Sequence, residues 1–99
     1  MKFRDLEKVR QIIKDATSLD VVYAYDDLVF PEHAAFLIRF DDEDENNFFC
    51  YFHKDCIAED QNKLLESLQG VSNQKDCQLL FKGLFDMKQK GEEVEIHFL

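Results

Sequence analysis

Residues 34–53 read AAFLIRFDDEDENNFFCYFH, and this stretch decides the fold. Two apolar, β-prone runs flank the polar run 41–47, whose Asp, Glu and Asn residues favour turns and solvent over strand pairing. The pattern therefore predicts strands over 34–40 and 48–53, joined as a hairpin. The side chains expected on the buried seam of this hairpin are Phe36, Ile38, Phe40, Phe48, Cys50 and Phe52.

Helical and strand patterns flank the hairpin on both sides. Apolar residues spaced by three and four predict helices over 3–16, 56–69 and 74–90, and alternation predicts strands over 19–25 and 94–98. The order α-β-β-β-α-α-β is typical of the α+β fold class, with an antiparallel β-meander, a C-terminal strand and helices mainly on one face. The 99 residues suit a single acidic domain, 1–99.

The composition indicates a folded chain that does not bind nucleic acid directly. Hydrophobic residues make up 45% of the sequence, too many for a disordered chain. Twelve Lys and Arg against 21 Asp and Glu give a net charge of −9, whereas nucleic-acid binders need cations to neutralise phosphates. No apolar run suits a membrane span, and residues 1–7 are too charged for a signal peptide, so we expect a cytoplasmic protein without membrane contact.

The negative charge is concentrated in the middle of the chain. Residues 20–60 have a net charge of −10, and the flanking segments have +2 and −1. Acidic loops often do no more than keep a protein soluble, but this segregation favours a surface that attracts a basic protein. The candidate partner-binding residues are Asp26, Asp27, Glu32, Asp41, Asp42, Glu43, Asp44 and Glu45.

We therefore expect a small non-enzymatic binding protein that engages a basic protein surface, for example a DNA mimic that inhibits a nuclease or DNA-binding complex. The predicted order, a helix before a β-meander and further helices after it, resembles that of some small acidic phage proteins that block CRISPR effectors. This resemblance implies a similar inhibitory role. The alternatives are an immunity-type partner of a basic toxin and a homodimeric structural module.

Aromatic side chains supply a second candidate interface. Tyr23, Tyr25, Phe49 and Tyr51 lie on strand faces opposite the expected seam or on the neighbouring strand. Strand order decides whether a helix buries them or whether they form an exposed patch. Such a patch would mark either a homodimer or aromatic anchors for a basic partner.

Cysteine and histidine residues suggest a weaker metal-site hypothesis. Cys50, His53 and Cys56 have C-x2-H-x2-C spacing, and Cys77 is a candidate fourth zinc ligand. In a strand, however, Cys50 and His53 point to opposite faces, so buried reduced thiols are favoured and no cofactor is expected. Catalysis is likewise disfavoured, because no nucleophile motif and no glycine-rich phosphate loop is present in the sequence.

Overall fold

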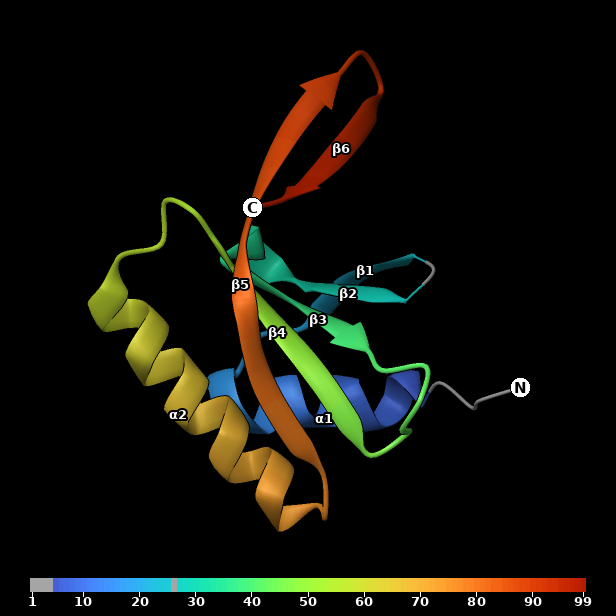
Figure 1. Ribbon diagram of the computed structural model, residues 1–99, viewed down its shortest axis with the longest axis vertical. Helices are drawn as coiled ribbons and strands as arrows, with labels where there is room; N and C mark the ends of the chain where they lie inside the picture. The colour runs from blue at the N-terminus through green and yellow to red at the C-terminus, as the bar shows by residue number, and fades with distance from the viewer. Residues whose placement is uncertain (1–4, 26) are drawn as a thin grey trace.

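The computed structural model describes residues 5–25 and 27–99 (Figure 1). It contains two helices, six strands and a short 3-10 turn, and the predicted α+β class is confirmed. The elements are α1 (Leu6–Thr17), β1 (Val21–Tyr25), β2 (Leu28–Pro31), the turn Glu32–Ala34, β3 (Phe36–Phe40), β4 (Asn47–His53), α2 (Ala58–Gln74), β5 (Gln78–Lys90) and β6 (Glu93–Phe98).

The strands form one mixed sheet in sequence order, β1-β2-β3-β4-β5-β6. All neighbours are antiparallel except β4 and β5, which run parallel because α2 forms the crossover between them. The predicted hairpin is present as β3 and β4, in which Phe36 pairs with Phe52, Ile38 with Cys50 and Phe40 with Phe48. The antiparallel meander and the C-terminal strand are therefore confirmed.

Both helices pack on one face of this sheet, as expected. Asp5 caps α1 by accepting a hydrogen bond from the backbone N–H of Lys8 at 3.0 Å. The helix then places Val9, Ile12 and Ile13 in a core shared with α2 and with the seam of the β3–β4 hairpin. These three side chains are at most 1% exposed, so this core excludes water almost completely.

The prediction of a helix over 74–90 is wrong, because most of these residues form β5. Phe81 lies on the helix-covered face, where its ring centre is 5.9 Å from that of Phe52. A bulge then places Leu84 on the same face, opposite Phe52. Side chains alternate between the two faces of the sheet on both sides of the bulge, but the bulge shifts the alternation by one residue. Phe81 and Leu84 are therefore three residues apart on one face, a spacing that resembles a helical repeat.

The structure differs from the predicted elements at two further places. The helix predicted over 56–69 continues to Gln74, and Leu28–Pro31 forms β2, where no strand was predicted. Since residues 75–99 contain no helix, the element order that resembled the phage inhibitors is not the order of this chain.

The C-terminal hairpin extends beyond the rest of the sheet. Residues 86–90 of β5 pair only with β6, and Gly91 makes the turn between them with φ of 62°. Figure 1 shows this hairpin rising from the upper end of the sheet. Its Met87 and Ile96 pack on a second buried cluster, Phe30, Leu37 and Phe85, on the sheet face opposite the helices.

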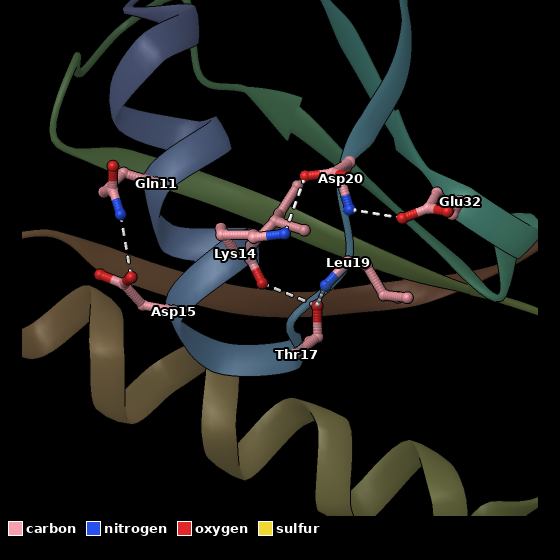
Figure 2. A network of polar contacts seen from close by, with 8 residues as sticks. Gln11, Lys14, Asp15, Thr17, Leu19, Asp20 and Glu32 are labelled. Atoms are coloured by element: carbon pink, nitrogen blue, oxygen red, sulfur yellow. Dashed lines mark hydrogen bonds and ion pairs between the residues drawn. The ribbon is translucent and has the colours of Figure 1, made fainter.

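A network of polar contacts fixes the start of β1 beside the end of β2 (Figure 2). Thr17 Oγ1 donates to the carbonyl of Ile13 at 2.7 Å and accepts from the N–H of Leu19 at 3.2 Å. The N–H of Asp20 donates to Glu32 Oε1 at 2.8 Å. These bonds end α1 and hold the β1–β2 hairpin in place relative to the helices. Within the described residues, no helix has both the length and the apolar character needed to cross a membrane.

Candidate protein-binding groove

A groove lies between the β1–β2 hairpin and the β5–β6 hairpin. It lies on the sheet face opposite the helices and has a volume of about 840 Å³. Its apolar lining comes from both hairpins: Val22, Tyr23, Tyr25, Leu28, Phe30, Pro31, Met87, Val94 and Ile96. A hollow of this size and lining is typical of a binding site.

The first wall of the groove is aromatic. The rings of Tyr23 and Tyr25 stack with centres 6.4 Å apart and planes 10° apart, and Tyr23 also contacts Phe30 with centres 5.8 Å apart. Tyr23 and Tyr25 are 56% and 66% exposed. Because neighbouring rings restrain both side chains, a partner could bury this aromatic area at a low cost in side-chain entropy.

The second wall is aliphatic at its base and acidic at its rim. Met87 and Ile96 are half-buried against the second cluster, and Val94 is exposed toward the groove. Glu92 and Glu93, at the tip of the hairpin, are exposed and line the groove, and His33 of the 3-10 turn completes the lining. Among the described residues, two Glu, one His and no Lys or Arg line the groove, so acidic side chains outnumber basic ones there.

The structure divides the predicted aromatic set. Tyr23 and Tyr25 are brought together in the groove wall. Tyr51, by contrast, is covered by Phe98 of β6, with ring centres 4.6 Å apart. Lys82 lies over the ring of Phe49, its Nζ 4.6 Å from the ring centre. Strand β6 and the bulge of β5 thus cover Tyr51 and Phe49, whose exposure depended on a strand order that the sequence did not reveal.

The predicted acidic residues fall at two ends of the sheet. Asp26 lies outside the described residues. Asp27 accepts a hydrogen bond from the N–H of Phe40 through its carbonyl at 2.9 Å, so it lies beside the β3–β4 loop that contains Asp41, Asp42, Glu43, Asp44 and Glu45. Glu32 lies at the other end of β2, where it accepts from Asp20.

Several of these carboxylates have structural partners. Asp27 Oδ2 accepts from Arg39 Nε at 2.8 Å, and this hydrogen bond is the main cause that raises the pKa of Arg39. Asp41 accepts from the N–H of Glu43 at 2.8 Å, and Asp44 from that of Asn46 at 2.9 Å. The side chains of Asp41 and Asp44 therefore also stabilise the turn that carries them.

Glu92 and Glu93 are the site residues that sequence reasoning missed. They follow Gly91 between two alternating runs, which is the signal of a hairpin turn. The helix expected over 74–90 placed them after a helix end instead, so their place in the lining of the groove could not be predicted. Leu28 and Phe30 were missed because no strand was predicted between residues 25 and 34.

The four residues of the metal hypothesis do not meet at one point. Cys50 and Cys77 lie in the helix-side core, and burial raises the pKa of the Cys50 thiol to about 12. His53 faces the opposite side, where its Nδ1 accepts from the N–H of Asp55 at 3.1 Å. In the described part of the chain, no three His, Cys, Asp or Glu side chains are arranged to hold a metal ion.

A smaller hollow of about 480 Å³ lies at the start of α2, lined in part by His33, His53, Cys56 and Asp60. Burial, and secondarily the charge of Asp60, raises the pKa of the Cys56 thiol. Its Sγ points to the carbonyl of Ile57, 3.9 Å away. A raised pKa disfavours the thiolate, the form in which a cysteine acts as a nucleophile.

Comparisons of the chain with protein-family models, with curated proteins and with solved structures gave no match. Its function is therefore argued from its own geometry and charge.

Proposed function

We propose that this chain is a non-catalytic binding protein whose groove engages a basic, partly apolar surface of another protein. The observation that carries the proposal is the pairing of an exposed aromatic wall, Tyr23 and Tyr25, with an acidic rim, Glu92 and Glu93. Aromatic side chains supply much of the affinity of protein interfaces, and complementary charge supplies specificity and speed of association.

The charge of the whole chain supports the same class of partner. With a net charge of −9, the chain attracts cationic proteins from a distance and repels nucleic acid and other acidic proteins. The groove then adds a local reason for selectivity, since among its described lining residues two are Glu and none is Lys or Arg.

If the chain acted as a nucleic-acid mimic, the β3–β4 loop would be the binding site, and its carboxylates would stand in place of phosphates. The groove is the better supported site, for two reasons. Asp27 is already paired with Arg39, and the side chains of Asp41 and Asp44 are bound within their own turn. An inhibitory or immunity-type role would follow from which basic protein occupies the groove.

The first test is capture of a partner by the immobilised chain from a lysate of its source cells. The retained protein should be basic, and it should elute as NaCl is raised from about 0.05 M to about 0.5 M, since salt screens charge. Retention of neutral or acidic proteins alone, or elution that salt does not affect, would contradict the proposal.

A matched pair of charge reversals localises the binding. Glu92→Lys changes the groove rim, and Glu66→Lys changes an exposed position on α2, across the sheet from the groove. Both alter the net charge equally. We expect Glu92→Lys to weaken capture by about tenfold or more and Glu66→Lys by much less, because only the former reverses charge at the contact. Equal losses would assign the effect to net charge alone.

A further inference from the structure

The edge of the sheet beside the groove is unusually unprotected. Strand β1 is the outermost strand, and its sequence VVYAY contains no charge and no proline. Val22, Tyr23 and Tyr25 are each more than half exposed. Natural sheets usually guard such edges with charged side chains or proline, because free backbone N–H and C=O groups pair readily with another strand.

The opposite edge of the same sheet is guarded. Strand β6 alternates Glu93, Glu95 and His97 with its apolar residues. Glu95 is bound to Lys90 at 3.2 Å and to His97 at 3.0 Å, which places charges along this edge. The contrast singles out β1 as the edge that is available for pairing.

We propose that a basic, extended segment of the partner adds as a further strand beside β1 and fills the groove with its alternate side chains. This inference rests on the proposed function and specifies its geometry. Every second side chain of an added strand lies on the face of Tyr23 and Tyr25, within reach of the aromatic wall. Cationic side chains of the same segment meet Glu92 and Glu93 across the groove.

The charge of the chain favours a segment of another protein over a second copy of this chain as the strand that pairs with β1. A second copy would bring another −9 and its own Glu92 and Glu93 toward an acidic rim. Like charges brought together in this way oppose association, whereas a lysine-rich or arginine-rich strand gains from the same field. The occupant is therefore a cationic strand with apolar residues at alternate positions.

The probe for this inference is the capped heptapeptide acetyl-Lys-Val-Lys-Val-Lys-Val-Lys-amide, titrated into the full chain and followed by calorimetry. Two modified peptides carry backbone N-methyl groups, one at every valine and the other at every lysine except the first. The two have equal numbers of methyl groups, but they block opposite edges of an extended strand. We expect one to bind about as tightly as the parent and the other to bind at least about tenfold more weakly, through lost hydrogen bonds.

Variants of the chain identify the site of the peptide. Tyr23→Ala should weaken binding of the parent peptide. Phe81→Ala, which removes an exposed aromatic side chain on the other face of the sheet, should leave binding nearly unchanged.

Each alternative outcome has a distinct meaning. Equal binding of both methylated peptides, with Tyr23 still required, would overturn strand addition and leave the proposed function standing. If no peptide bound, but the chain still captured a basic protein and this capture required Glu92, strand addition would again be overturned and the proposed function would stand. A dimer of the free chain that Tyr23→Ala dissociates would replace the cationic strand by a second copy and overturn the inference.

Discussion

Two aromatic residues on the same face of the sheet illustrate the difference between packing and binding. Phe85 is fully buried beneath the C-terminal hairpin, whereas Tyr25 remains 66% exposed on the groove wall. Burial determines what each contributes to folding, because only area removed from water stabilises the native state. Residues that stay exposed after folding can still contribute to a partner interface.

The first prediction compares these two positions by urea denaturation. Phe85→Ala should lower the free energy of unfolding by about 3 to 5 kcal/mol, through lost contacts and a cavity. Tyr25→Ala should lower it by less than about 1 kcal/mol, as is usual for exposed positions. If the two variants lost equal stability, Tyr25 would be a packing residue and the groove wall would not be available to a partner.

We expect Glu95 to make the β5–β6 hairpin sensitive to acid. The hydrogen bond from Lys90, followed by the one from His97, lowers the pKa of the Glu95 carboxyl below its ordinary value of 4.5. A carboxyl whose pKa is lower in the folded state stabilises the fold fully above the unfolded value. That contribution is lost as pH falls through the lower, folded value.

The second prediction compares the native chain with Glu95→Gln as pH decreases. Between about pH 5 and pH 3, the stability of the native chain should decline more steeply than that of Glu95→Gln, because the variant has no carboxyl to protonate at this position. Thermal unfolding at each pH measures the two slopes. Parallel slopes would show that the contacts of Glu95 with Lys90 and His97 do not stabilise the fold.

At the scale of elements, the predictable parts were those with one uninterrupted pattern. The β3–β4 hairpin, α1 and β6 each keep a single period, and each was predicted close to its observed place. Strand β5 changes phase at its bulge beside Gly83, so its apolar residues imitated a helix. The groove could not be foreseen because one of its walls belongs to β5, and because the curvature that brings two hairpins together has no local sequence signal.

The third prediction uses two glycines to test these element boundaries. Gly70 lies inside α2 with open space where a Cβ would be, so Gly70→Ala should stabilise the protein by about 0.5 to 1 kcal/mol. Gly91 has φ of 62° in the hairpin turn, so Gly91→Ala should destabilise it by about 1 to 2 kcal/mol. Chemical denaturation measures both changes. A loss of stability in Gly70→Ala would indicate that the helix stops at this glycine.

At the scale of the whole molecule, two acidic regions compete for the role of binding site. One is the β3–β4 loop, which the sequence favoured. The other is the rim of the groove, which only the structure revealed. Figure 1 shows the β5–β6 hairpin at the top of the view and the β3–β4 loop at the lower right, so a small partner segment would engage one region at a time.

The fourth prediction separates these regions with two double variants that remove the same charge. Asp41→Asn with Asp44→Asn keeps a side-chain oxygen to accept the N–H groups of Glu43 and Asn46. Glu92→Gln with Glu93→Gln neutralises the groove rim. We expect the rim variant to weaken binding of the lysine–valine heptapeptide by about tenfold and the loop variant by about threefold or less. The opposite ranking would move the binding site to the loop.

The most direct test of the groove as a binding site is an NMR titration of the isotope-labelled chain with that heptapeptide. We expect the amide signals of β1 and of the β5–β6 hairpin, including those of Tyr23, Tyr25, Val94 and Ile96, to shift together and saturably, while those of α1 and α2 stay almost unchanged. Shifts concentrated in residues 41–46, or spread evenly over the acidic surface, would contradict it.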